Sequence, residues 1–110
     1  MPEDSLSAEA ITRDLGTRII GRDVLYYPAL PSTMIEAAEQ ARKGAAEGTV
    51  IIAGEQTAGR GRMNRAWLAP GGNIALSLIL YPDLSSLPSL IMVASLAVAG
   101  AIEAVTGLKP

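Results

Sequence analysis

The sequence predicts an α/β (α+β) domain, in which helices flank a mixed sheet. Apolar residues make up 49% of the 110 residues, which is enough to build a core for one small domain. They are mostly Ala, Leu, Ile and Val, with no Phe, a composition that suits helices packed on a sheet. Segments with helical and strand periodicity alternate along the chain, and this order is typical of helices layered against a sheet.

The first half of the chain contains two predicted helices and two predicted strands. In order, these are a helix over residues 7–15, a strand over 23–27, a helix from Thr33 to Gly44 and a strand over 49–55. Ser7 is a candidate N-cap and Gly16 a stop signal for the first helix, and Pro28 ends the first strand. Thr33 and Glu36 have the spacing of a capping box. The apolar stripe of the second helix is Met34, Ala37, Ala38 and Ala41.

The second half is predicted to contain a loop, a strand, a turn and a long helix. They cover residues 56–72, 73–81, 82–86 and 88–107 in that order. In the strand, leucines and Ile74 alternate with small residues, so one side of the strand is expected to pack tightly. Residues 87–102 are uncharged, but this run is shorter than the ~20 residues that a membrane span needs. A buried helix is the prediction for this segment.

Composition excludes several classes of site. The chain has no Cys and no His, so neither a thiolate metal site nor Ser-His or Cys-His catalysis is available within it. The net charge of −2 argues against a general nucleic-acid binder, since such proteins usually carry a broad basic face. The acidic N-terminus lacks the apolar region of a signal peptide. A cytoplasmic protein without a membrane partner is expected.

The predicted loop has an unusual concentration of positive charge. Arg60, Arg62 and Arg65 supply a third of the nine Lys and Arg residues in the chain. Gly59 and Gly61 would let the backbone approach a ligand closely, and guanidinium groups suit carboxylate and phosphate oxygens. The spacing matches neither a P-loop nor the dinucleotide fingerprint. An anion site, with phosphate as the expected anion, is the functional interpretation, and a solvated basic loop anchored by a tryptophan is the alternative.

The same loop resembles a known family. The stretch QTAGRGR at residues 56–62, followed by Arg65 and Trp67, is similar to the GRGRxxRxW loop of biotin protein ligases. Ser32 and Thr33 resemble the Ser-Thr-Asn that precedes this loop in the family, and PGGNIALS at residues 70–77 resembles its loop-to-strand passage. The resemblance runs from about residue 21 to the C-terminus. It implies the fold shared by class II aminoacyl-tRNA synthetases and biotin ligases.

The resemblance implies a two-step reaction that uses ATP and Mg²⁺. The carboxylate of biotin attacks the α-phosphate of ATP, which gives biotinyl-5′-adenylate and pyrophosphate. A lysine amine on the biotin carboxyl carrier domain of a biotin-dependent carboxylase then attacks the mixed anhydride. Arginines, together with Mg²⁺ held through the phosphates, would neutralise the charge that develops, and no metal site on the protein itself is expected.

The resemblance also assigns residues to roles. Arg60 and Arg62 are the candidate catalytic residues, and Arg62 is expected to retain the adenylate. The residues expected to bind biotin are Ser32, Thr33, Met34, Gln56, Gly59, Arg60, Gly61 and Arg62. The residues expected to bind ATP or the adenylate are Arg62, Arg65 and Trp67. The strand over residues 73–80 is expected to line the pocket for the ring and alkyl chain of biotin.

This sequence departs from the family pattern in two ways. Met34 stands where the family usually has asparagine, which removes one polar contact to the head group of biotin. The family's Lys-Trp-Pro-Asn-Asp segment and its later catalytic lysine would lie beyond Pro110. We therefore expect residues 1–20 to be a helical lead-in and residues 21–110 to be the first part of a ligase catalytic domain. No winged-helix segment precedes it in this chain, so no DNA partner is expected, and a homodimer paired through sheet edges is a possibility that the family suggests.

Three alternative functions remain open at this level. A lipoate-type acyl ligase shares the general fold, although the GRGRxxRxW loop speaks against it. A non-catalytic fragment that binds biotin would lack turnover. A nucleic-acid binder that uses the arginines is the weakest alternative, given the acidic balance of the chain.

Overall fold

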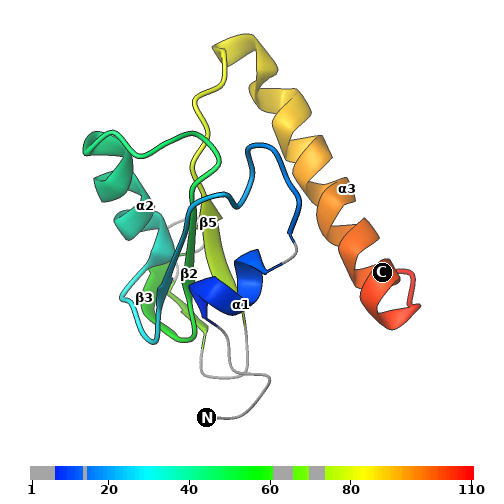
Figure 1. Ribbon diagram of the computed structural model, residues 1–110, viewed down its shortest axis with the longest axis horizontal. Helices are drawn as coiled ribbons and strands as arrows, with labels where there is room; N and C mark the ends of the chain where they lie inside the picture. The colour runs from blue at the N-terminus through cyan, green and yellow to red at the C-terminus, as the bar shows by residue number, and fades with distance from the viewer. Residues whose placement is uncertain (1–6, 14, 61–65, 70–73) are drawn as a thin grey trace. The chain divides into compact units, whose positions relative to one another are not determined.

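The computed structural model describes residues 7–13, 15–60, 66–69 and 74–110 (Figure 1). The elements, in chain order, are α1 (Ala8–Thr12), β1 (Val24–Tyr27), α2 (Thr33–Arg42), β2 (Val50–Ala53), β3 (Gln56–Arg60), β4 (Ala66–Ala69), β5 (Ala75–Leu78), a 3₁₀ turn η2 (Leu84–Ser86) and α3 (Leu87–Thr106). The chain forms two compact units, Met1–Leu80 and Tyr81–Pro110.

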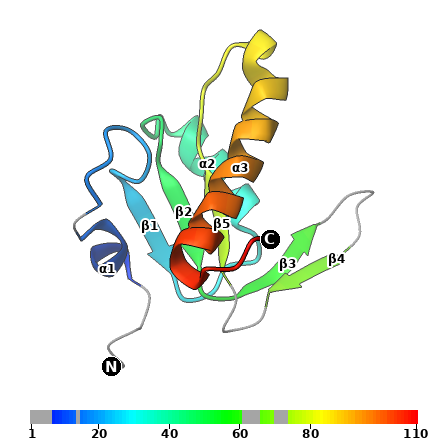
Figure 2. The same cartoon turned by 90° about the vertical axis from the view of Figure 1, so that its right-hand side faces the viewer.

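The first unit is built on a mixed three-stranded sheet with the strand order β1-β2-β5. Strand β1 runs parallel to β2, with Val24 opposite Val50, and β5 runs antiparallel to β2, with Ser77 opposite Ile51. Figure 2 shows the three strands side by side. The predicted mixed sheet flanked by helices is therefore confirmed. Its central strand β2 is buried along its whole length, as a β-branched run between two partners should be.

One helix packs on each face of this sheet. Paired residues on neighbouring strands point to the same face, so the sheet has two distinct core clusters. The cluster on the first face combines Val24, Val50 and Ile52 with Ala8 and Ile11 of α1. The cluster on the second face is covered by α2.

The second cluster contains Ala37 of α2, Ile51 and Ile79. Ile51 is completely buried, and burying such a side chain stabilises the fold by about 1.5–3 kcal/mol. The buried side of α2 is made by Thr33 and Ala37, whereas Met34 and Ala38 of the predicted apolar stripe are exposed. The buried side follows i, i+4 spacing because these two positions lie on the face of α2 that is turned toward the sheet.

The two helices begin with serine caps. The hydroxyl of Ser7 accepts a hydrogen bond from the Ala10 N–H at 3.0 Å, which confirms the predicted start of α1. The N-cap of α2 is Ser32, whose hydroxyl accepts from the Ile35 N–H at 3.4 Å. The predicted capping box of Thr33 and Glu36 is therefore wrong, because the helix begins one residue earlier than that pairing requires.

Glu36 has a different role from the predicted cap. Its Oε2 accepts hydrogen bonds from the Tyr27 hydroxyl at 3.2 Å and from the Gln40 amide at 2.8 Å. Burial, followed by the nearby charge of Glu36, raises the pKa of Tyr27 above its ordinary value. Glu36 thus ties α2 to the end of β1.

The segment predicted to be a loop from Gln56 to about residue 72 contains a β-hairpin. Strand β3 pairs antiparallel with β4, with Gly59 opposite Trp67 and Arg60 opposite Ala66. The register shifts between Gln56 and Gly59. Glycine, arginine and alanine gave no strand signal, so the loop prediction was wrong here; the pairing between the two arms decides the structure.

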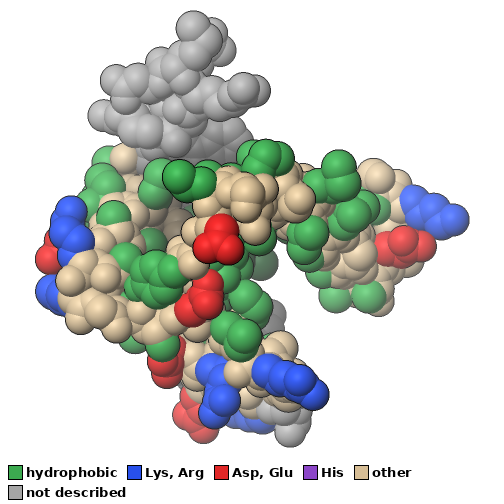
Figure 3. All heavy atoms as spheres, turned by 90° about the horizontal axis from the view of Figure 1, so that it is seen from above, with side chains coloured by type: hydrophobic (Ala, Val, Ile, Leu, Met, Phe, Trp, Pro, Cys, Tyr) green, Lys and Arg blue, Asp and Glu red, His purple; other side chains and the backbone are tan. Residues whose placement is uncertain are grey.

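The second unit contains the 3₁₀ turn and α3. The predicted helix is confirmed, and it ends at Gly107, whose φ of 77° is the left-handed conformation that glycine adopts readily. Within this unit no residue of α3 is buried, and the burial of the helix in the whole domain stays a prediction. Its unit offers no second layer to cover it. Apolar side chains are visible on the surface in Figure 3, and Ile91, Met92 and Leu96 are among the exposed ones.

The helical segment Leu84–Thr106 has 23 residues and a mean hydropathy of 1.9. This segment is longer than the uncharged run over residues 87–102. By length and composition it could cross a membrane. A single helix of this kind is weak evidence for a span, because the core helices of soluble proteins pass the same test.

Candidate functional site

The start of α2 and the start of β3 are held together by backbone hydrogen bonds. The Leu30 N–H donates to the Glu55 carbonyl at 2.9 Å, and the Thr57 N–H donates to the Leu30 carbonyl at 3.0 Å. The Ala58 N–H donates to the Pro31 carbonyl at 2.7 Å. These bonds place β3 parallel to the segment that leads into α2. As a result, Gln56 lies beside the first turn of α2.

Gln56 makes two hydrogen bonds to one residue of that turn. Its Oε1 accepts from the Thr33 backbone N–H at 2.9 Å and from the Thr33 hydroxyl at 3.2 Å. The first N–H groups of a helix have no partner within the helix, and Gln56 supplies one from 23 residues away in sequence. Gln56 therefore caps α2 together with Ser32.

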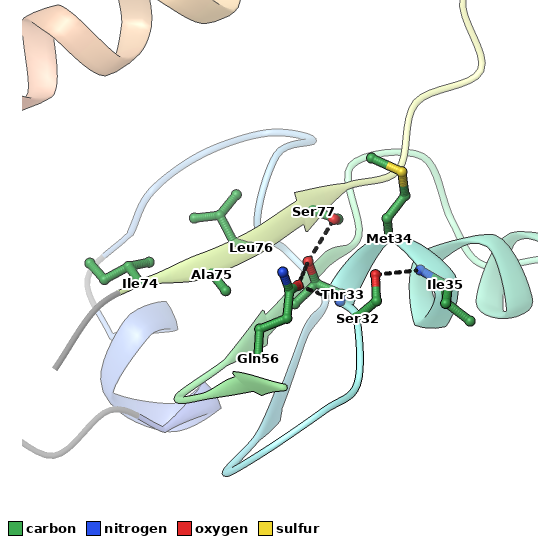
Figure 4. Close-up of a pocket in the computed structure, with 9 residues that line it drawn as sticks. All are labelled: Ser32, Thr33, Met34, Ile35, Gln56, Ile74, Ala75, Leu76 and Ser77. Atoms are coloured by element: carbon green, nitrogen blue, oxygen red, sulfur yellow. Dashed lines mark hydrogen bonds between the residues drawn. The ribbon is translucent and has the colours of Figure 1, made fainter. Parts of the chain in front are cut away.

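The strand β5 completes this polar cluster. The hydroxyl oxygens of Thr33 and Ser77 lie 2.9 Å apart. Ser77 faces the α2 side of the sheet because it is opposite Ile51, whose side chain belongs to the α2 core cluster. Three elements that are distant in sequence thus meet through three polar side chains, Thr33, Gln56 and Ser77 (Figure 4).

These residues line an open pocket of about 430 Å³, a size within the usual range for small-molecule sites. The lining residues are Ser32, Thr33, Met34, Ile35, Gln56, Ile74, Ala75, Leu76 and Ser77. Ser32 and Thr33 are only 7% and 4% exposed, whereas Met34 is 71% exposed at the rim. The pocket therefore combines a fixed polar cluster with apolar walls from β5 and the residue before it. Such a lining suits a ligand with a polar head and an apolar body.

The structure brings together four of the residues that the sequence singled out. Ser32, Thr33, Met34 and Gln56 all line this pocket. The strand that was expected to line it does so through residues 74–77. Their role in binding biotin stays a prediction.

Three of the remaining candidates lie in the paired strands β3 and β4. Gly59 and Arg60 are in β3, and Trp67 is in β4 opposite Gly59. Gly61, Arg62 and Arg65 lie outside the described residues. Because Gln56 is the first residue of β3, the strand that carries Gly59 and Arg60 starts at the wall of the pocket.

Sequence reasoning did not single out Ser77 or Ile35 as site residues. Ser77 was included only as one residue of the strand over 73–80 that was expected to line the pocket, with no polar contact assigned to it. The available signal was its position between Leu76 and Leu78, because a hydroxyl on the packed face of a strand needs a hydrogen-bond partner. That partner, Thr33, is 44 residues away in sequence, so only the fold reveals it.

The described pocket residues supply hydroxyl and amide groups and no carboxylate. No group of three or more Asp and Glu residues that could hold a metal ion occurs within the part of the chain that the structure describes.

Comparison with known proteins places these features in context. Residues 26–110 match the profile of the biotin/lipoate A/B protein ligase family. The chain is 43% identical over 107 residues to the bifunctional ligase/repressor BirA of Bacillus spizizenii strain W23, and 42% identical to the protein of the same name in Bacillus subtilis strain 168. Each match covers 94% of this chain and 33% of the relative. The chain thus spans about a third of the length of the curated relatives it matches.

Proposed function

Because this chain belongs to the biotin/lipoate A/B protein ligase family, we propose that it carries the biotin- and ATP-binding part of a biotin protein ligase. The reaction is the ATP-dependent ligation of biotin to a lysine of a biotin carboxyl carrier protein, by way of biotinyl-5′-AMP. The observation that carries the proposal is the Thr33–Gln56–Ser77 cluster, which lies in a pocket at the start of the strand that leads to the arginines. The names of the two Bacillus relatives support ligase activity.

In this proposal the pocket holds biotin. Ser32, Thr33 and Gln56 contact its head group, and residues 74–77 with Met34 contact its ring and alkyl chain. The carboxylate end points toward the hairpin. Gly59 and Gly61 allow the backbone of that segment to approach the ligand closely.

Arg60, Arg62 and Arg65 are proposed to neutralise the negative charges that meet during adenylation. Arg60 and Arg62 hold the biotin carboxylate and the α-phosphate, which otherwise repel each other, and so stabilise the transition state. Arg65 binds phosphate, and Trp67 packs by the adenine. Mg²⁺ enters with the phosphates of ATP. The oxygen of the carboxylate forms a bond to the α-phosphorus, and pyrophosphate leaves.

The domain bounds, the acceptor protein and the location of the enzyme are proposed on the basis of the same family resemblance. Residues 1–20 form a lead-in, residues 21–110 belong to the catalytic domain, and the acceptor is the carrier domain of a biotin-dependent carboxylase. The protein acts in the cytoplasm. The repressor function in the names of the relatives is not carried over to this chain, because it spans only a third of their length.

Two experiments test the proposal, ligand titration with the 110-residue chain and ATP–pyrophosphate exchange with the full-length enzyme. Isothermal titration with biotin and with lipoate is expected to show binding of biotin only. ATP–pyrophosphate exchange is expected to depend on biotin. Preference for lipoate in both assays would favour a lipoate-type ligase. Biotin binding without pyrophosphate exchange would favour a non-catalytic binding fragment, and binding of neither acid would contradict the proposed function.

A further inference from the structure

The segment between α1 and β1 lies against a glycine in the loop that leads from α2 into β2. Residues 17–22 of this segment are called the strap below. The Gly21 N–H donates to the Gly48 carbonyl at 2.9 Å, and this hydrogen bond joins the strap to the loop. Both glycines have a positive φ, 80° for Gly21 and 92° for Gly48, a conformation that other residues rarely adopt. The junction is thus made by two glycine backbones.

There is no room for a side chain at Gly48. A Cβ atom at this position would lie 2.2 Å from the carbonyl oxygen of Ile19 and 2.7 Å from its carbonyl carbon. These are backbone atoms of the strap, so a change of side-chain rotamer cannot relieve the overlap. The strap can therefore lie in its observed place only because position 48 is a glycine.

The loop on the Gly48 side of the junction is fixed to the sheet. The Gly48 N–H donates to the Ile79 carbonyl at 2.8 Å, and the Ile79 N–H donates to the Thr49 carbonyl at 2.9 Å. The hydroxyl of Thr49 donates to the Ala46 carbonyl at 2.7 Å. Thr49 and Ile79 are both buried. This side of the junction is therefore part of the buried framework of the first unit.

The strap side of the junction is held much more weakly. Gly21 is buried, but residues 17–20 and 22 are exposed. Within the strap, the Arg22 N–H donates to the Ile19 carbonyl over 3.5 Å, which is long for a hydrogen bond. Segments with few buried contacts and exposed backbone hydrogen bonds open locally, at a lower free energy than global unfolding. We therefore expect the strap to open before the sheet does.

We propose that the strap is a conformational latch, which opens and closes on Gly48 while the sheet stays folded and which needs a glycine at position 48 to close. The closed strap forms one wall of a second cleft of about 400 Å³, lined by Arg18, Ile19, Arg22, Asp23, Ala46 and Glu47. The latch thereby decides whether the connection from α1 to β1 is fixed, and with it whether this cleft exists. The inference goes beyond the proposed function, because no strap residue lines the pocket at the start of α2.

Hydrogen exchange of the parent 110-residue chain tests whether the strap opens by itself. The Gly21 N–H reports the strap, and the Val50 N–H, which donates to the Asp23 carbonyl at 2.9 Å, reports the sheet. The Gly21 N–H is expected to be at least about tenfold less protected than the Val50 N–H. Equal protection of the two amides would overturn the proposal, because the strap would then open only together with the sheet.

Limited digestion with trypsin tests the role of Gly48 through Gly48→Ala and a matched control, Gly44→Ala. Gly44 has a φ of 88°, and a Cβ atom there would meet nothing within 4 Å. Both variants thus strain the backbone, but only Gly48→Ala collides with the strap. Cleavage after Arg18 and Arg22 is expected to be at least about tenfold faster in Gly48→Ala than in Gly44→Ala. Cleavage after Arg42, at the end of α2, should stay within about twofold.

Three results with the variants would overturn the proposal. Equal cleavage of the strap in both variants would show that Gly48 does not hold it closed. A parallel rise in cleavage after Arg42 in Gly48→Ala, or failure of that variant to fold, would show that the strap cannot open without the rest of the first unit. Titration of the parent chain with biotin is a separate measurement, and absence of binding there would contradict the proposed function while leaving the latch intact.

Discussion

Gln56 and Thr33 are joined by two hydrogen bonds that meet on one atom. The Oε1 of Gln56 lies 2.9 Å from the Thr33 backbone nitrogen and 3.2 Å from the Thr33 hydroxyl. The first bond satisfies an N–H at the start of α2, and the second fixes the hydroxyl that faces Ser77. One side chain therefore stabilises the helix and orients the pocket, and the two roles can be separated by substitution.

Replacing Gln56 with glutamate is expected to preserve the helix cap and to abolish the donor function in the pocket. A carboxylate still accepts from Thr33, and a negative charge at a helix N-terminus is favourable by about 0.3–1 kcal/mol. It has no N–H to offer a ligand, so biotin affinity should fall at least about tenfold. Thermal unfolding and titration with biotin measure the two effects. Thr57→Glu, which adds the same charge at an exposed position of β3 outside the pocket, should leave affinity unchanged. Loss of stability in Gln56→Glu would contradict the capping role.

Restoring asparagine at position 34 is expected to strengthen biotin binding. Met34 lines the pocket but is 71% exposed, so a shorter amide can replace its thioether without leaving a cavity in the core. The added amide should contribute one hydrogen bond, or roughly threefold to tenfold in affinity. Titration of Met34→Asn against Met34→Ala isolates the effect of the amide. An equal affinity for the two variants would show that position 34 makes no polar contact with the ligand.

Arg62→Gly in the full-length enzyme is expected to release biotinyl-adenylate prematurely. The guanidinium group is proposed to hold the carboxylate and phosphate oxygens of the intermediate, and glycine offers neither charge nor donor. The released biotinyl-adenylate is measured by chromatography after enzyme, biotin and ATP are mixed. Arg18→Gly removes an exposed arginine elsewhere and serves as the control. Retention of the adenylate by Arg62→Gly would contradict the assignment.

Stability is expected to fall in alkaline solution through the titration of Tyr27. Burial and the nearby Glu36 raise the pKa of Tyr27 in the folded chain above its value of about 10 in the unfolded chain. The folded state thus binds the phenolic proton more tightly. The corresponding stability is fully present below pH 10 and is lost as the pH rises through the folded-state pKa. Urea unfolding between pH 8 and pH 12 should show a steeper decline for the parent chain than for Tyr27→Phe. Parallel declines would show that Tyr27 does not contribute.

Several elements could be predicted from local sequence because local chemistry forms them. Ser7 caps its helix through the N–H three residues later, and Gly107 ends α3 in a conformation that glycine adopts readily. The run of β-branched residues that forms β2 predicts a buried strand because it has no polar face to expose. The candidate residues Ser32, Thr33 and Gln56 were likewise identified from the sequence, through a motif that resembles a family.

Other features depend on contacts between residues that are far apart in sequence. Strand β3 was predicted to be loop because Gly59 and Arg60 have low strand propensity, and its structure comes from pairing with β4. The capping box failed because Ser32, rather than Thr33, occupies the N-cap. The burial of α3 depends on which element covers it, and composition reports only how apolar the helix is.

The sequence by itself therefore determined the three helices, the strands β1, β2 and β5, and the family. Periodicity, caps and a short motif are properties of neighbouring residues, and they are readable without the fold. Only the tertiary structure decided that Thr33, Gln56 and Ser77 form one hydrogen-bonded cluster, because their spacing of 23 and 44 residues carries no local signal. The direction of each hydrogen bond, and with it the polarity of the pocket, follows from the backbone N–H at the start of α2, which the fold places against Gln56.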